Sequence, residues 1–145
     1  MIKVRRARQS DAEELARLSS QLGYLISGNE LARILAILDS DDDHAIFVAE
    51  KNPKNIAGFV HIFLTRRLFL ASFAELGGLV VDSDSWGEGF GVTLLKAAER
   101  WVVKQGVKEI RVRSNILREE ARGFYLEQGF QDSKKQTVFY KSISR

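Results

Sequence analysis

The chain contains no cysteine, one proline and only two histidines, His44 and His61. Without cysteine it can form neither disulfides nor thiolate metal sites, and no covalent mechanism can pass through a cysteine nucleophile. Two histidines are too few for a histidine-rich metal site, so we expect no metal. The composition therefore excludes thiol chemistry and the common zinc sites.

Long apolar runs are absent as well. No run approaches the roughly 18 residues that a membrane span requires. The N-terminal stretch MIKVRRARQSDAEE lacks the apolar core of a signal peptide. Hydrophobic residues make up 45% of the 145 residues and charged residues 28%, as in an ordinary globular protein. These features predict a cytoplasmic protein with a single domain over residues 1–145 and no membrane partner.

The basic residues are scattered along the chain, and the net charge is only +3. A protein that binds nucleic acid usually carries a stronger basic stripe, so we expect no nucleic-acid partner. That class of function stays open to a salt-titrated binding assay. A small anionic ligand requires much less positive charge.

The apolar periodicity predicts a mixed α/β domain with a largely antiparallel first half and the element order β-α-α-β-β-β-α-β-α-β. Capping boxes at Ser10 and Ser27 mark the starts of the first two helices. The expected elements are strands at residues 2–7, 45–50, 57–65, 73–81, 109–114 and 137–143, and helices at residues 10–22, 27–38, 92–105 and 117–128.

The segment LVVDSDSWGEGFGVTLLKAAERW, residues 79–101, places three glycines where a strand gives way to a helix. Gly87, Gly89 and Gly91 would let an anion approach the unpaired N–H groups of the helix N-terminus. The spacing G-x-G-x-G differs from the dinucleotide fingerprint, and no G-K-[ST] follows as in a P-loop. Spacing alone leaves two interpretations open: a phosphate-binding loop, or a tight turn that only permits close packing.

Three other side chains are candidates for chemistry. Asn115, at a strand end, can bond a ligand amide, and Tyr125, on the next helix, can donate a proton. A helix cap and a core aromatic residue explain the same two positions. Glu75 interrupts an apolar strand, where a carboxylate is either paired, used as a base, or turned to solvent. His61 is most simply explained as a core residue with a satisfied hydrogen bond.

Together and in this order, these pieces resemble the GNAT superfamily of acyl-CoA-dependent N-acyltransferases over nearly the whole chain. The family signature Gln/Arg-x-x-Gly-x-Gly/Ala is matched by WGEGFG, residues 86–91, and SNILREEARGFY, residues 114–125, resembles a pattern of bacterial members. The resemblance implies a mainly antiparallel central sheet with splayed middle strands, flanked by helices. It also implies acetyl-CoA as co-substrate.

The resemblance further implies how coenzyme A is held. Backbone amides of residues 87–92 would hold the pyrophosphate, and residues 79–81 would pair with the pantetheine arm, one N–H polarising the thioester carbonyl. Asn115 would contact the pantetheine or an ordered water. The implied cofactor-binding residues are Leu79, Val80, Val81, Trp86, Gly87, Glu88, Gly89, Phe90, Gly91, Val92, Asn115, Arg118 and Ala121.

The implied reaction is direct attack by a primary amine on acetyl-CoA in a ternary complex, which agrees with the missing cysteine. Glu75 would deprotonate the substrate ammonium, through water, and Tyr125 would protonate the departing thiolate. The acceptor would be a small-molecule or peptide amine, bound near Tyr24, Asn29 and Glu30. Dimerisation through the C-terminal strands is frequent in such folds, so the resemblance also allows a homodimer.

The sequence departs from the family pattern in three places. Trp86 replaces the usual Gln or Arg, Glu88 stands where relatives often have a basic residue, and Gly77 and Gly78 replace a frequent carboxylate. None of these changes removes a backbone N–H, so we expect the loop to bind coenzyme A, less tightly than in relatives. The alternative function is a non-catalytic acyl-CoA sensor or regulatory module, which measurable turnover would exclude.

Overall fold

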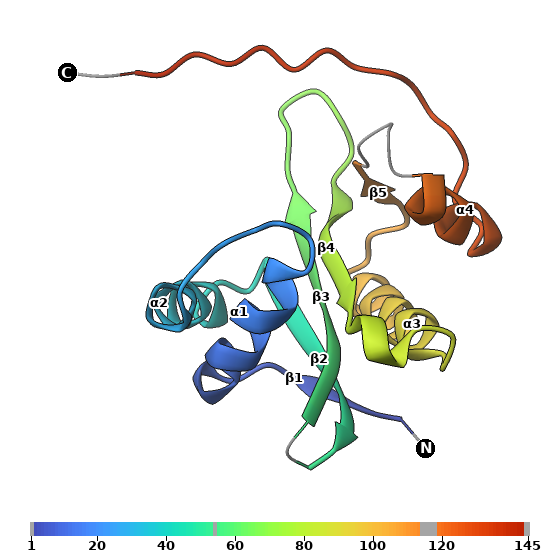
Figure 1. The fold of residues 1–145 in the computed structure, drawn as a ribbon. Coiled ribbons are helices and arrows are strands. Elements are labelled where there is room, and N and C mark those ends of the chain that lie inside the picture. The colour runs from blue at the N-terminus through green and yellow to red at the C-terminus, as the bar shows by residue number, and fades with distance from the viewer. Residues whose placement is uncertain (1, 54, 114–118, 144–145) are drawn as a thin grey trace. The chain divides into compact units, whose positions relative to one another are not determined.

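The computed structural model describes residues 2–53, 55–113 and 119–143, in two units, Met1–Arg113 and Ser114–Arg145 (Figure 1). The elements are β1 Lys3–Arg6, α1 Ala12–Ser20, α2 Gly28–Asp39, β2 His44–Asn52, β3 Asn55–Thr65, β4 Phe73–Val81, α3 Phe90–Lys104, β5 Ile110–Val112 and α4 Glu119–Glu127, with short 3-10 helices at Gln9–Asp11 and Ser83–Ser85.

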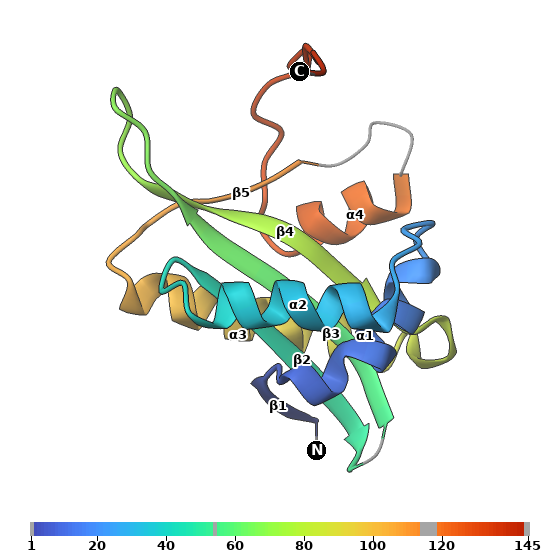
Figure 2. The same ribbon diagram turned by 90° about the vertical axis from the view of Figure 1, so that its left-hand side faces the viewer.

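The first unit is built on a five-stranded sheet in the order β1-β2-β3-β4-β5. The first three pairings are antiparallel, and β4 pairs with β5 in parallel. Helices α1 and α2 cover one face of the sheet and α3 covers the other (Figures 1 and 2). The mixed α/β fold and the mainly antiparallel sheet that the sequence predicts are confirmed.

The core lies on both faces of the central strands. Strand β3 buries side chains on both sides, as its continuous apolar sequence predicts. Leu18 of α1 and Leu94 of α3 are both fully buried, on opposite faces of the sheet. Each such leucine stabilises the fold by about 1.5–3 kcal/mol. This packing holds β4 and the start of α3 in place.

The two predicted capping boxes have different outcomes. Ser27 caps α2, its hydroxyl accepting a hydrogen bond from the Glu30 N–H at 3.1 Å. The cap at Ser10 is wrong, because a 3-10 turn precedes α1 and Asp11 is the N-cap residue. The Asp11 carboxylate accepts a hydrogen bond from the Arg8 N–H at 2.7 Å and another from the Arg5 guanidinium at 2.9 Å.

The described part of the second unit, residues 119–143, contains helix α4 and an extended tail. Helix α4 ends before Gly129, whose φ of +92° is a conformation that favours glycine. The closing strand predicted for residues 137–143 is wrong, since those residues form no strand in this unit. A strand needs both a pairing partner and a buried face, and the apolar side chains here stay exposed. They are Val138, Phe139, Tyr140 and Ile143.

None of the helices within the described ranges is long and apolar enough to cross a membrane.

Candidate functional site

The parallel pairing between strands β4 and β5 is short. The register runs from Ala74 opposite Ile110 to Leu76 opposite Val112 and ends there. Beyond that point, residues 77–81 have no strand partner on the β5 side in the described part of the chain. The short pairing agrees with the splayed middle strands implied by the family resemblance, and within the described part of the first unit it leaves residues 77–81 as an open backbone edge.

The direction of the backbone groups on this edge follows from the way N–H and C=O groups alternate along a strand. The Asp82 N–H donates to the Ala57 carbonyl at 2.7 Å, toward β3. Successive residues point their N–H and C=O groups to opposite sides. Val81 and Leu79 therefore direct theirs to the open edge. An extended ligand placed there has strand-like hydrogen-bond partners.

A β-bulge lies just before this edge. His61 pairs with Gly78 and Ile62 with Leu76, so Gly77 is an extra residue in β4. A Cβ atom at Gly77 would lie 3.0 Å from both His61 Nδ1 and the Phe63 ring, whereas a Cβ at Gly78 would meet nothing within 4 Å. The two glycines thus let the His61 ring lie close to β4 and leave open space beside it.

The glycine loop leads from β4 into α3. Gly87 and Gly89 have φ values of +81° and +90°, in the left-handed region where glycine is favoured. Gly89 is the N-cap, and the Thr93 N–H, which donates to the Gly89 carbonyl at 3.1 Å, closes the first turn. The N–H groups of residues 90–92 precede that bond and have no intrahelical partner. Gly91 lies inside the helix and takes no left-handed conformation.

Trp86 does more than pack at the edge of the loop. Its indole Nε1–H donates a hydrogen bond of 2.9 Å to the Val81 carbonyl, and its side chain is largely exposed. This bond occupies one of the backbone acceptors on the open edge of β4. Sequence reasoning missed this hydrogen bond, although the indole N–H is an available donor.

Glu88, beside the glycine loop, has a basic partner. Its carboxylate lies 3.5 Å from Lys51 Nζ, and both side chains are about half-exposed. An exposed pair of this kind contributes less than about 1 kcal/mol to stability. The nearby ammonium nevertheless offsets the negative charge that the sequence places next to the expected pyrophosphate site. Sequence reasoning missed Lys51.

Glu75 lies on β4 with its side chain 19% exposed, and Arg113 Nε donates to its Oε1 at 3.3 Å. It faces Phe63 across the β3–β4 pairing. The carboxylate is therefore neither free in solvent nor buried without a partner.

The two histidines lie together on neighbouring strands. His44 Nδ1 is 2.9 Å from His61 Nε2, and both rings lie against Phe63 at centroid distances of 5.1 and 5.2 Å. Burial, and secondarily the nearby His44, lowers the pKa of His61 to about 4. His61 is therefore neutral at pH 7. It has the hydrogen bond expected of a core histidine, and sequence reasoning missed the partner.

Tyr125 lies in the second unit, on α4. Its ring meets Phe124 and Phe130 edge-on at centroid distances of 5.3 and 5.4 Å. Burial raises the pKa of the Tyr125 hydroxyl, which therefore keeps its proton at neutral pH. Ala121 lies on the same helix.

The remaining predicted residues lie either outside the described ranges or on the protein surface. Asn115 and Arg118 lie outside the described residues. Tyr24, Asn29 and Glu30 are all solvent-exposed on the connection between α1 and α2 or at the start of α2. Within the described ranges no hydrogen bond joins these three side chains to one another.

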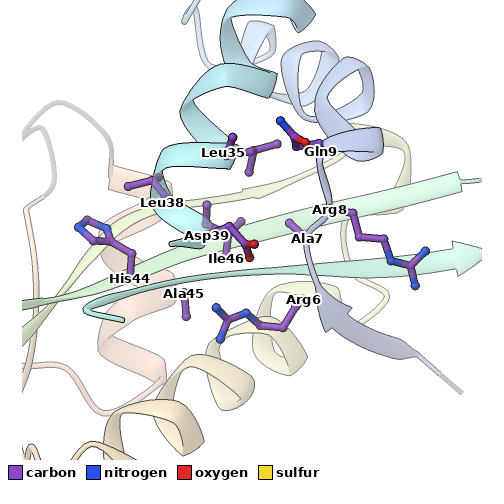
Figure 3. Close-up of a pocket in the computed structure, with 11 residues that line it drawn as sticks. Arg6, Ala7, Arg8, Gln9, Leu35, Leu38, Asp39, His44, Ala45 and Ile46 are labelled. Carbon is purple, nitrogen blue, oxygen red and sulfur yellow. The ribbon is translucent and has the colours of Figure 1, made fainter. Parts of the chain in front are cut away.

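A cavity of about 340 Å³ lies between α2 and strands β1 and β2 (Figure 3). Arg6, Arg8, Asp39 and His44 supply polar groups to its wall. Neither the glycine loop nor the open edge of β4 lines it. The candidate functional site is therefore the loop and the open edge of β4, which carry amides without a backbone partner, and not this cavity.

Comparison with known families gives a match to the acetyltransferase (GNAT) family over residues 10–130. A search of curated protein sequences gives no match.

Several solved structures share the fold. A transcriptional regulator from Bacillus halodurans C-125 has a TM-score of 0.82 at 21% identity, over 97% of this chain and 100% of that chain. Glucosamine-6-phosphate N-acetyltransferase from Arabidopsis thaliana has a TM-score of 0.82 at 20% identity, over 98% and 99%. AAC(6')-Iy, in complex with the bisubstrate analog CoA-S-monomethyl-acetylneamine, has a TM-score of 0.85 at 17% identity, over 99% of both chains.

Proposed function

Because the chain belongs to the acetyltransferase (GNAT) family and is therefore an acetyltransferase, we propose that it transfers the acetyl group of acetyl-CoA to a primary amine by direct attack in a ternary complex. The observation that carries the proposal is the open edge of β4 running directly into a glycine-capped helix N-terminus. The edge offers strand-like pairing and the helix start offers unpaired amides, which suit the two ends of one extended, anionic ligand.

The amides of residues 87–92 hold the pyrophosphate in this proposal, assisted by the positive end of the α3 dipole. No acidic residue lies in the first turn of α3, and the charge of Glu88, just before that turn, is offset by Lys51. The N–H and C=O groups of Leu79 and the N–H of Val81 pair with the pantetheine arm. An edge N–H also polarises the thioester carbonyl as negative charge develops on its oxygen. Because Trp86 occupies the Val81 carbonyl, the arm has one acceptor fewer on this edge.

The catalytic roles go to Glu75 and Tyr125. The substrate ammonium loses a proton to the Glu75 carboxylate through water, which frees the lone pair that attacks the acetyl carbon. The new C–N bond forms, the C–S bond breaks, and the Tyr125 hydroxyl gives its proton to the departing thiolate. The nitrogen loses its second proton to solvent, which gives the neutral amide, and solvent returns a proton to Tyr125. The raised pKa of Tyr125 keeps that proton in place until the thiolate forms.

The acceptor in this proposal is a small-molecule amine ahead of a peptide. Structural relatives include aminoglycoside acetyltransferases, one of them solved with sisomicin. The exposed Tyr24, Asn29 and Glu30 supply an aromatic ring, an amide and a carboxylate, which suit a polar, cationic molecule.

Release of the coenzyme A thiol in the presence of a panel of amines tests the proposal. The protein has no cysteine, so a thiol reagent detects only the coenzyme. We expect release that depends on an amine, with the acetylated product found by mass spectrometry. Binding of acetyl-CoA without release for any amine in the panel would instead support the non-catalytic sensor.

Tyr125→Phe is expected to lower kcat at least tenfold, because the leaving thiolate loses its proton donor. The KM for acetyl-CoA should change less than about twofold. Tyr140→Phe, at an exposed tyrosine of the same unit, is the matched control and should keep full activity. An unchanged kcat in Tyr125→Phe would remove Tyr125 from the mechanism.

A further inference from the structure

Three side chains form a row that leads from the surface to the bulge in β4. Asp41 Oδ2 lies 3.8 Å from His44 Nε2. His44 Nδ1 lies 2.9 Å from His61 Nε2, and His61 Nδ1 lies 3.0 Å from the position of a Cβ at Gly77. The outer end is open, since the Asp41 side chain is half-exposed and His44 lines the cavity beside α2 (Figure 3).

The Asp41 carboxylate lies close enough to His44 to favour one of its two tautomers. A carboxylate beside His44 Nε2 favours the tautomer with its proton on that nitrogen. In that tautomer His44 Nδ1 is an acceptor, and His61 Nε2–H would donate the bond across the 2.9 Å between the two nitrogens. His61, which is neutral at pH 7, is left with a bare lone pair on Nδ1.

The His61 Nδ1 atom is unpartnered within the described residues and is not fully buried. No fully buried side-chain nitrogen or oxygen in that part of the chain lacks a partner, so Nδ1 is not completely shielded from solvent. The space beside it includes Gly78, where a Cβ would meet nothing within 4 Å. Glu75 lies on the same strand, three residues before Gly78, and opposite Phe63.

We propose that His61 Nδ1 binds the acceptor amine by accepting one of its N–H groups above the Gly77 bulge, and that His44 and Asp41 are positioning residues that fix the tautomer of His61. This inference rests on the proposed N-acetyltransferase function and adds a substrate-binding residue to it. A half-buried acceptor leaves a hydrogen bond unmade when the ligand has no donor. The site therefore favours an acetyl acceptor whose nitrogen carries an N–H group.

Long-range 1H–15N NMR spectra test the tautomer directly, since the protein has only two histidines to assign. At pH 7 we expect His61 to carry its proton on Nε2, and addition of the amine found in the activity screen to shift the Nδ1 resonance. His44→Phe should give a mixture of His61 tautomers, and His44→Gln, whose amide oxygen can accept the Nε2–H bond, should restore the single form. A wild-type His61 protonated on Nδ1 would overturn the inference.

Steady-state kinetics test the contact with the substrate. His61→Phe is expected to raise the KM for the amine about tenfold, the loss of one hydrogen bond to a charged or polar group. The KM for acetyl-CoA should stay within about twofold, and His61→Gln should recover part of the amine affinity. Circular dichroism confirms that each variant is folded.

Failure of this inference and failure of the proposed function give different results. A wild-type protein that turns over an amine, together with a folded His61→Phe of unchanged amine KM, overturns the role of His61 alone. A wild-type protein that acetylates no amine overturns the proposed function, and the role of His61 with it.

Discussion

Gly89→Trp is expected to weaken acetyl-CoA binding at least 100-fold. Gly89 is the N-cap of α3, with φ at +90°, and a side chain there covers the unpaired amides of the first helical turn. Losing two hydrogen bonds to a charged phosphate, at about 1.5 kcal/mol each, corresponds to roughly 100-fold in Kd. A Cβ at this position meets only Ile2 Cδ1, at 4.0 Å, so the indole extends into solvent and does not enter the core.

Gly106→Trp is the matched control for this variant. Gly106 follows the opposite end of α3, has φ at +75°, and a Cβ there meets no atom within 4 Å. Both variants force a bulky residue into a left-handed conformation, so both lose about 1–2 kcal/mol of stability. Only Gly89→Trp should lose binding in a calorimetric titration. Equal affinity in the two variants would mean that the loop does not hold the coenzyme.

Asp11→Ala is expected to destabilise the fold by about 3 kcal/mol. Arg5 donates two hydrogen bonds of 2.9 Å to the Asp11 carboxylate and one of 2.6 Å to Glu50. The side chains of Asp11 and Arg5 are 7% and 16% exposed, so the cation is nearly buried between its partners. Removing Asp11 leaves part of the guanidinium without a counter-charge. Urea denaturation measures the change, with Asp42→Ala, at an exposed aspartate, as the control.

The same carboxylate makes stability depend on pH. Burial raises the pKa of Asp11, but the hydrogen bonds from Arg5 and Arg8 outweigh burial and hold the pKa below its usual value. The stabilisation is therefore complete above the unfolded pKa of about 3.9 and is lost as pH falls through the lower folded value. We expect the gap in unfolding free energy between wild type and Asp11→Ala to be constant from pH 5 to 7 and to narrow below about pH 4. A gap that widens in acid would contradict this assignment.

The parts of the site that lie close together in the sequence were predictable. The strand, the glycine loop and α3 follow one another without a break, so local patterns place Gly87 and Gly89 correctly. Their positive φ values are also what glycine at a turn suggests. The interpretation of Glu75 as a carboxylate on a central strand is local in the same way.

The side-chain partners were not predictable, because they depend on strand register. Arg5 reads as one of a small basic group, but the pairing of β1 with β2 puts it next to Glu50. The bond between His44 and His61 spans 17 residues and exists only in the observed β2–β3 register. A shift of one residue would turn one of the two rings to the opposite face.

The C-terminal tail shows that a local sequence pattern can predict a strand that does not form. Residues 137–143 have high strand propensity, yet propensity alone supplies neither a neighbouring strand nor a buried face. Residues 137–143 have no neighbouring strand and no buried face in the described part of this unit. The predicted last strand is therefore absent.

The most direct test of the central assignment is a titration of the 15N-labelled protein with acetyl-CoA, followed through its backbone amide resonances. The account predicts that the largest shifts occur at Leu79, Val81 and residues 87–92, the open edge of β4 and the start of α3. Shifts confined to the cavity between α2 and β2, or no shifts at saturating acetyl-CoA, would contradict it.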